Sequence, residues 1–305
     1  MRIVTFICSI TFILLFWGCS EKNSPLGKDA SKLSVLATTS IVADLVKEIG
    51  DTAIVLESLM GAGVDPHLYK ASSGDLAKLR NADIIFYNGL HLEGKMTDIF
   101  EKLEHSKPTI PVAVSSFKGI RILSESMYDP HIWFSISLWK QAAERVKNQL
   151  ITSAPKNKPY FEKNYLNYIQ TLDSFDMWVK NAIDSIPKER RILVTAHDAF
   201  AYFGAEYGIE IHSLQGISTI AEFGINDVIS IVNIIDSKNI PAVFVESSVP
   251  PKSIQAVISA VKTRNKTVKL GGTLHSDALG ERNSPTGIYI GMFKSNVQTI
   301  VEALR

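Results

Sequence analysis

The sequence contains very little cysteine. Two cysteines occur in 305 residues, Cys8 inside an apolar run near the N-terminus and Cys19 just after it. The rest of the chain therefore has no thiol, which excludes a disulfide framework and any thiolate ligand for a metal. A metal site in the body of this protein would have to be built from nitrogen and oxygen ligands.

An excess of charge of one sign is also missing. The 32 Lys and Arg residues nearly balance the 31 Asp and Glu residues, which gives a net charge of +1 at pH 7. Because nucleic-acid-binding domains usually carry a basic face, we expect no nucleic-acid partner. Low-complexity tracts, fixed-period repeats and a phosphate-binding Gly-x-x-x-x-Gly-Lys-Ser/Thr loop are absent, so the chain is not itself predicted to be an ATPase.

No apolar run is long enough to span a bilayer as a helix, which takes about 20 residues. The longest run, at residues 3–17, follows Arg2 and stops at Gly18 and Cys19. A small residue before a cysteine at the end of such a run is typical of a bacterial lipoprotein signal. We therefore predict a signal peptide over residues 1–18 and lipidation of Cys19.

Residues 19–32 are rich in Asn, Ser, Pro, Gly and Lys, and this composition predicts a flexible tether behind the lipidated cysteine. The alternative is an ordinary secretory signal peptide, because Phe16 and Trp17 are bulkier than the residues usual before a lipidated cysteine. In the lipoprotein interpretation, a lipid anchors the protein to a membrane on its periplasmic or cell-surface side.

Short apolar segments alternate with amphipathic ones along the rest of the chain. This alternation is typical of α/β folds with parallel sheets covered on both faces. The predicted strands are residues 33–39, 53–59, 84–87, 109–114, 191–195, 209–214, 242–246 and 267–270. With 46% hydrophobic residues, the chain can form two domains of ordinary size. We predict an N-terminal lobe over residues 33–156 and a C-terminal lobe over residues 188–305.

The segment between the lobes differs from both. From Phe161 to Ile186, apolar residues recur every three or four positions, which predicts one long helix. Pro159 opens the segment and Pro187 closes it. At 1.5 Å per residue such a helix is about 40 Å long. We therefore assign residues 157–187 to a helix that links the two lobes.

Four polar residues stand out in loops spread over the whole chain: His67, His131, His197 and Asp277. The first two occur in the same tripeptide, Asp-Pro-His, and His197 lies two residues beyond a predicted strand. Proline restricts its own φ and the conformation of the residue before it, which stiffens the backbone that holds the histidine. A site formed by all four would take two ligands from each half, so a bound ion would bridge the lobes.

Three imidazoles and one carboxylate suit a divalent cation such as zinc or manganese and provide too few oxygens for calcium. Nearby acids could accept the second imidazole N–H, and the candidates are Asp65, Asp129, Asp198 and Glu246. Taken singly, a loop histidine is more often solvated, and an aspartate such as Asp277 is more often a turn residue. The ordinary role is assigned to the remaining histidines: His91, His105, His212 and His275.

At these residues the chain resembles the zinc and manganese substrate-binding lipoproteins of bacterial ABC transporters, the cluster A-I metal-binding proteins. The matching stretches are Gly63-Val64-Asp65-Pro66-His67-Leu68-Tyr69, Asp129-Pro130-His131-Ile132-Trp133, Thr195-Ala196-His197-Asp198-Ala199-Phe200-Ala201-Tyr202-Phe203, Val245-Glu246-Ser247-Ser248 and Ser276-Asp277-Ala278-Leu279-Gly280. They occur in the family's order, and the resemblance covers residues 33–305.

The resemblance implies two (β/α)₄-like lobes joined by a long rigid helix, with a metal bound in the cleft between them. It implies that His67, His131, His197 and Asp277 are the ligands. Among the nearby acids, Glu246 and Asp198 are our candidates for the residues that support them. The implied function is capture of a metal ion and its delivery to an ABC permease whose ATPase is a separate cytoplasmic subunit. We expect a monomeric binding protein and no enzymatic activity.

Two departures from the family pattern bear on the metal. Many zinc-specific members carry a long loop rich in histidine and acids in the first lobe, whereas residues 115–129 contain no histidine. Many manganese members have glutamate at the third ligand position, where this chain has His197. The chain thus resembles the subgroup with three histidines and one aspartate. Zinc is the expected metal, because imidazole ligands and the Irving–Williams order favour it over manganese, the alternative.

A secreted zinc-dependent hydrolase is the rival interpretation. Such an enzyme keeps one coordination position open for water and places a general base beside it. No His-Glu-x-x-His or comparable motif is present in the sequence. With all four ligands assigned to a closed shell, the sequence favours a binding protein.

Overall fold

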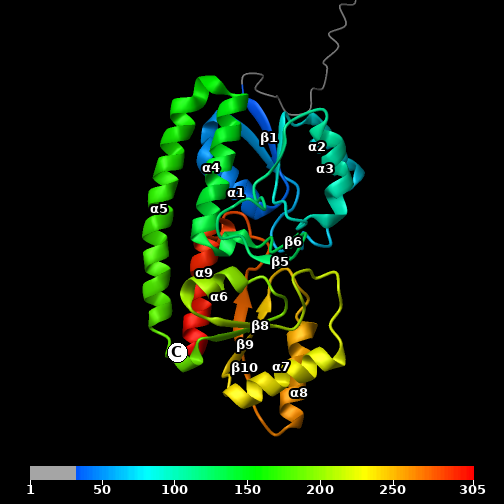
Figure 1. Cartoon of the computed structure of the whole chain (residues 1–305), viewed down its shortest axis with the longest axis vertical. Helices are drawn as coiled ribbons and strands as arrows, with labels where there is room; N and C mark the ends of the chain where they lie inside the picture. Colours follow the sequence, from blue (N-terminus) through cyan, green and yellow to red (C-terminus); the bar gives the residue numbers. More distant parts are fainter. Residues whose placement is uncertain (1–31) are drawn as a thin grey trace, which may run out of the picture. The chain divides into compact units, whose positions relative to one another are not determined.

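Four parallel strands form the sheet of the N-terminal lobe in the computed structural model, which describes residues 32–305. The predicted signal peptide, the lipidation at Cys19 and the tether up to residue 31 lie outside the described residues. The strands are β1 (Leu33–Ala37), β2 (Ile54–Ser58), β3 (Ile84–Tyr87) and β4 (Thr109–Pro111), and they lie in the order β2-β1-β3-β4. Helices flank this sheet: α1 (Ser40–Gly50), α2 (Ser73–Asn81), α3 (Thr97–Glu104) and α4 (Ile136–Ser153). Figure 1 shows α1 and α4 on one face of the sheet and α2 and α3 toward the other.

The C-terminal lobe is also built from parallel strands and helices. Its strands are β7 (Ile192–Thr195), β8 (Glu210–Ser213), β9 (Ala242–Glu246) and β10 (Lys269–Leu274). They form two parallel pairs, β7 with β8 and β9 with β10, and β7 lies close to β9. The helices of this lobe are α6 (Ala201–Tyr207), α7 (Ile225–Lys238), α8 (Lys252–Thr263) and α9 (Tyr289–Leu304). The predicted α/β class with parallel sheets is confirmed.

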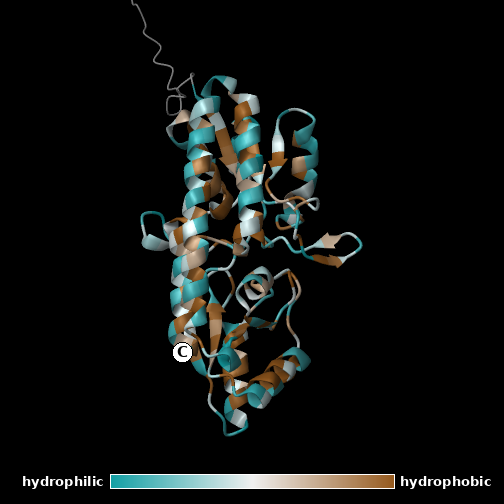
Figure 2. Cartoon of the chain, turned by 60° about the vertical axis from the view of Figure 1, so that its left-hand side comes forward, coloured by the Kyte–Doolittle hydropathy of each residue, from teal (hydrophilic) through white to brown (hydrophobic). Residues whose placement is uncertain are grey.

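The long helix α5 (Lys158–Asp184) has 27 residues and links the lobes, as the periodicity predicts. Phe161, Leu172 and Val179 are fully buried on its inner side. It packs against α1 and α4 of the first lobe and against α9 of the second. In Figure 2 the strands are mostly brown, whereas α5 presents teal residues outward. One helix therefore contributes to the packing of both lobes.

Each lobe has a small hydrophobic cluster of its own, and a third, larger core extends through both lobes. It includes Val35 and Phe86 from the first sheet and Phe244 from the second. Phe293 of α9 lies between them, with ring contacts to Phe134 and to other aromatic residues of both lobes. Residues 32–305 form one compact unit, so separate domains with boundaries at residues 156 and 188 stay a prediction.

A short antiparallel hairpin, β5 (Ile122–Ser124) with β6 (Met127–Tyr128), was not predicted. It projects from the body in Figure 2.

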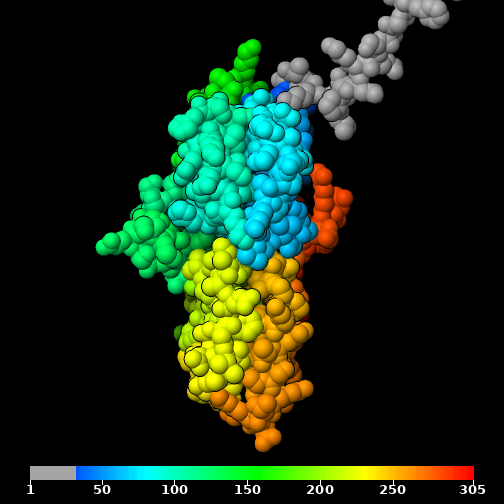
Figure 3. Space-filling model, turned by 90° about the vertical axis from the view of Figure 1, so that its right-hand side faces the viewer, coloured from blue at the N-terminus to red at the C-terminus, as the bar shows by residue number. Residues whose placement is uncertain are grey.

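Figure 3 shows the two lobes in contact along one face, with residues in blue and cyan above and residues in yellow and orange below. Among residues 32–305, no helix has the length and hydropathy needed to cross a bilayer.

Asp44 of α1 connects the first lobe to the start of α9. Its carboxylate is 7% exposed and accepts a hydrogen bond of 2.9 Å from the Tyr289 backbone N–H. Burial raises the pKa of Asp44 to about 7, although the Tyr289 N–H opposes this. The folded state then binds this proton more tightly than the unfolded state, so stability falls as the pH rises from about 4 to about 7.

Asp44→Asn should therefore stabilise the protein at high pH and leave it nearly unchanged at low pH. The amide oxygen of the substituted side chain can still accept the Tyr289 N–H, whereas the buried charge is gone. Since one pKa unit corresponds to about 1.4 kcal/mol, the gain at pH 8 relative to pH 4 is at most ~4 kcal/mol. Urea unfolding of metal-free wild type and variant between pH 4 and pH 8 measures this difference. Parallel stability profiles would contradict it.

Candidate metal centre

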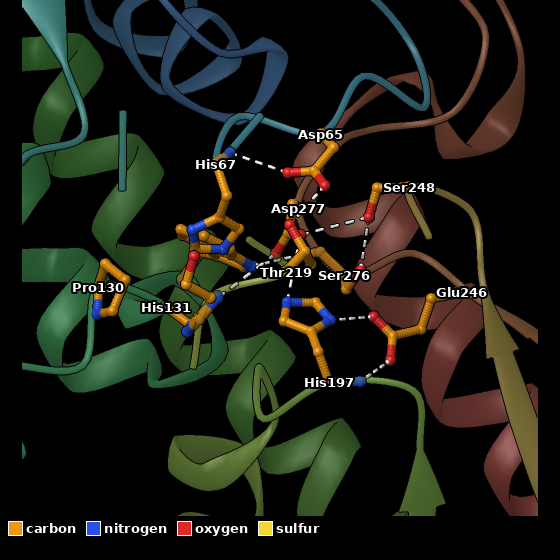
Figure 4. A network of polar contacts seen from close by, with 12 residues as sticks. Asp65, His67, Pro130, His131, His197, Thr219, Glu246, Ser248, Ser276 and Asp277 are labelled. Atoms are coloured by element: carbon orange, nitrogen blue, oxygen red, sulfur yellow. Dashed lines mark hydrogen bonds and ion pairs between the residues drawn. The ribbon is translucent and has the colours of Figure 1, made fainter. Parts of the chain in front are cut away.

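Three of the four predicted ligands follow strands of the parallel sheets, and the fourth, His131, follows the antiparallel hairpin of β5 and β6. His67 lies in the loop after β2, and His131 opens the short turn Ile132–Phe134 before α4. His197 comes two residues after β7, and Asp277 three residues after β10. Because ligand sites in parallel sheets form outside the carboxyl ends of the strands, these loops converge. Figure 4 shows the four side chains pointing toward one another.

The donor atoms of the four residues form a tight, buried group. One donor atom from each residue lies within 4.8 Å of the others. His197 Nε2 is 3.2 Å from Asp277 Oδ2, and His131 Nε2 is 3.6 Å from Asp277 Oδ1. All four side chains are at most 2% exposed. The structure thus brings together residues that are up to 210 positions apart in the sequence.

Several atoms that face this centre have no hydrogen-bond partner. They are Nε2 of His67, His131 and His197 and Oδ1 of Asp277. Buried polar atoms without partners are rare and destabilising, so each needs an explanation. A divalent cation satisfies all of them at once, because neutral imidazole nitrogen and carboxylate oxygen are the ligands that such ions take. The donor set therefore fits a metal ion.

Two carboxylates fix the far nitrogens of the imidazoles. His131 Nδ1 is 2.8 Å from Asp129 Oδ1, and His197 Nδ1 is 2.5 Å from Glu246 Oε2. Each carboxylate also accepts the backbone N–H of the same histidine, at 3.0 Å for Asp129 and 2.9 Å for Glu246. Because Nδ1 of each ring faces a carboxylate, Nε2 is the nitrogen that faces the centre and is placed to bind a metal.

The other two candidate acids take different roles. Asp65 accepts the His67 backbone N–H at 2.8 Å and the Thr219 hydroxyl at 2.6 Å. Asp198 pairs with Arg121 at 3.2 Å, and among the described residues its side chain makes no hydrogen bond or ion pair with a predicted ligand. Of the two supporting residues named from the sequence, Glu246 reaches an imidazole and Asp198 does not.

The electrostatics of the site agree with a strongly coupled cluster. Burial lowers the pKa of His67 to about 3, although Asp277 opposes this. Burial also acts to lower the pKa of His197, but Asp277 and Glu246 outweigh it and hold that pKa well above its usual value. Burial acts to raise the pKa of Asp277, and the histidines, His197 first, bring it below its usual value. A buried carboxylate that stays ionised is a preformed partner for a cation.

Contacts that the sequence did not predict close the centre from both lobes. Trp133 Nε1 donates to the Ser276 carbonyl at 2.8 Å, which ties the His131 loop to the Asp277 loop. The bond from Thr219 to Asp65 spans the lobes on another side. Trp133 follows His131 by two residues and ends one of the stretches that resemble the family, but neither signal indicated a bond to the Asp277 loop.

Histidines outside the four were assigned ordinary roles, and the structure places them outside the cluster. His275 precedes Asp277 by two residues, yet the group of residues that could hold a metal contains only the four, among the residues described. His275 packs by its backbone against Asn296 instead, which accepts its N–H at 2.8 Å and donates to its carbonyl at 2.7 Å.

Comparison with known proteins identifies close relatives. The family model described as "Zinc-uptake complex component A periplasmic" (ZnuA) matches residues 35–303. The manganese-binding lipoprotein MntA of Bacillus subtilis is 46% identical over 291 residues, which cover 94% of each chain. The zinc-binding protein TroA of Treponema pallidum is 43% identical over 281 residues, 91% of each chain. The solved structure of that periplasmic protein matches with a TM-score of 0.86 and covers 90% of this chain and 99% of its own.

Proposed function

The chain belongs to the ZnuA family of periplasmic components of zinc-uptake complexes, and from this premise we propose that it captures Zn²⁺ for import. Whichever metal it carries, the chain is a metal-binding substrate-binding protein of an ABC transporter. It is extracytoplasmic and is not an enzyme. The observation that carries the proposal is the set of four buried donor atoms, three nitrogens and one oxygen, that converge without hydrogen-bond partners.

Zinc is the proposed metal because of the ligand set. Three imidazoles suit zinc better than manganese, and at any such site the Irving–Williams order places Zn²⁺ above Mn²⁺ in affinity. The site supplies one carboxylate, Asp277, whereas manganese favours oxygen-rich sites. The similarity to TroA, a zinc-binding protein, supports this choice.

Manganese is the second candidate. The relative MntA, at 46% identity, is a manganese-binding lipoprotein, and its similarity to this chain extends over nearly the whole length. A site that binds zinc more tightly can still carry manganese where free manganese is abundant and free zinc is scarce, since occupancy follows both affinity and availability.

Delivery requires the closed site to open. The ligands are almost fully buried, and the bonds from Thr219 to Asp65 and from Trp133 to Ser276 join the lobes around them. We propose that a membrane permease, driven by a separate cytoplasmic ATPase, parts these contacts and accepts the ion. In this proposal, the lipid on Cys19 keeps the monomeric protein next to the membrane.

The secreted hydrolase receives no support. The family is one of solute-binding proteins rather than enzymes. A catalytic zinc site keeps an open position for water, whereas these donors are buried in the structure.

The proposed function predicts one bound divalent ion and a preference for zinc. Protein purified without added metal should contain about one equivalent of metal, and Zn²⁺ should displace Mn²⁺ in a competition titration. The two affinities should be measured by titrating the protein against a chelator whose affinity for each metal is known. Equal affinities, or displacement of Zn²⁺ by equimolar Mn²⁺, would rule out zinc as the preferred ion. Absence of any tight site would overturn the proposed function.

A further inference from the structure

A strained loop is hydrogen-bonded to the segment that carries the predicted ligand His131. It runs from Asn88, at the end of β3, to Glu93. Gly89, Leu90 and His91 all have positive φ, at 91°, 52° and 63°. Two consecutive non-glycine residues in this region cost free energy, so the surrounding structure must hold the loop in place. Gly89 is required as well, because a Cβ there would lie 2.6 Å from the Ala113 carbonyl oxygen.

Glu93 holds the loop from inside. Its carboxylate is 3% exposed and accepts the Thr38 hydroxyl at 2.6 Å and the Asn88 backbone N–H at 2.7 Å. It also accepts the Gly89 N–H at 3.3 Å. Thr38 follows β1 directly, so Glu93 ties the strained loop to the centre of the sheet.

Asn88 extends from this loop to the backbone of the ligand tripeptide. Its Nδ2 donates to the Pro130 carbonyl at 3.0 Å and to the Gly89 carbonyl at 3.2 Å, and the side chain is fully buried. Only the NH₂ end of the amide can face two carbonyl oxygens, so the orientation is determined by its partners. Pro130 immediately precedes His131, and Figure 4 shows both beside the centre.

We propose that Asn88 is a positioning residue for the metal ligand His131, and that Glu93 and Thr38 hold Asn88 in place. Asp129 determines which ring nitrogen of His131 carries the proton, while Asn88 determines where the backbone of that loop lies. The inference rests on the proposed function, since positioning His131 matters for binding only if the site takes a metal.

A double-mutant cycle tests the proposal. Asn88→Ala should raise the dissociation constant for Zn²⁺ by about 10–100-fold, as is typical when a partner of a ligand is lost. In a His131→Ala background the same substitution should change it less than about 3-fold, because the ligand that Asn88 positions is gone. In a His67→Ala background the full loss should remain. An equal loss in both backgrounds would show that Asn88 acts only through general stability, and would overturn the proposal.

A control variant separates affinity from stability. Thr109→Val removes a side-chain-to-backbone bond of the same sheet, the partly buried bond from the Thr109 hydroxyl to the Lys107 carbonyl at 3.3 Å. It should lower the unfolding temperature without changing Zn²⁺ affinity. Glu93→Gln keeps an acceptor for Thr38 and Asn88, so it should retain more affinity than Glu93→Leu. If Thr109→Val weakened Zn²⁺ binding as much as Asn88→Ala, the positioning role would be wrong.

A measurement without metal distinguishes failure of this inference from failure of the proposed function. In metal-free protein, Asn88→Ala should increase amide hydrogen exchange in residues 127–134 at least several-fold and leave residues 192–198 unchanged. A wild type that bound no metal would overturn the proposed function, but this exchange experiment would still test the link between Asn88 and the His131 loop. Unchanged exchange in residues 127–134 would overturn that link.

Discussion

His197→Ala is expected to weaken Zn²⁺ binding by about 10²–10³-fold. Zinc sites with four protein ligands provide roughly 10–16 kcal/mol, so one ligand accounts for about a quarter of this, and 1.4 kcal/mol is a factor of ten. The effect should lie at the upper end, because the variant also leaves Glu246 buried without the ring that it contacts at 2.5 Å. Mn²⁺ should lose less, since imidazole contributes less to its binding.

The measurement is a competition titration of wild type and variant with the same chelator for each metal. His212→Ala is the matched control. It removes another imidazole that pairs with a glutamate, Glu210 at 2.7 Å, but this pair lies on the exposed side of β8. His212→Ala should leave both affinities unchanged. A dissociation constant that His197→Ala does not alter would remove this residue from the site.

The three histidines among the predicted ligands stand out in the sequence because local rules constrain them. In the two Asp-Pro-His tripeptides, proline limits the backbone on either side, and His197 follows a strand whose apolar run is easy to recognise. The long helix was equally accessible, because its stripe of apolar residues continues for more than twenty residues between two prolines. Short-range patterns therefore predicted the link between the lobes and marked the four residues as candidates, whereas their role as ligands came from the family resemblance.

The supporting contacts were harder to predict because they depend on tertiary structure. Glu93 follows a loop with three positive φ values, and neither hydrophobic periodicity nor a turn motif marks it. Trp133 looks like a core residue, yet its indole N–H reaches Ser276, 143 positions away. Asp129 and Asp198 both lie beside a predicted ligand, but only Asp129 contacts an imidazole, and the backbone path of each loop decides this.

The shared core was likewise not apparent from the alternation of elements. Strand and helix patterns describe each lobe separately, so they suggest two independent cores. In the structure, Phe293 of α9 packs against rings from both lobes, and Asp44 of α1 receives the first N–H of the same helix. The bond from Tyr289 to Asp44 joins residues 245 positions apart, and no local pattern encodes the pairing.

Asp277→Asn is the second variant with a large expected effect. Asp277 is the only carboxylate in the group of four, and it lies 3.2 Å from His197 Nε2 and 3.6 Å from His131 Nε2. The asparagine keeps the shape of the side chain but leaves a dication among neutral ligands in a buried site. We expect Zn²⁺ affinity to fall by about 10²–10³-fold, comparable to loss of a histidine. Asp236→Asn, at a surface ion pair with Arg264, is the control and should leave Zn²⁺ affinity unchanged.

The two variants should shift metal preference in opposite directions, and this comparison tests the assignment more strictly than either loss alone. Removing the oxygen ligand in Asp277→Asn should weaken Mn²⁺ binding more than Zn²⁺ binding, because manganese favours carboxylate and zinc tolerates an imidazole-rich site. Removing the nitrogen ligand in His197→Ala should weaken Zn²⁺ binding more. The dissociation constant for Zn²⁺ divided by that for Mn²⁺, measured by the same competition titration, should therefore rise in His197→Ala and fall in Asp277→Asn. A shift in the same direction in both would mean that the two side chains do not act as distinct ligands of one ion.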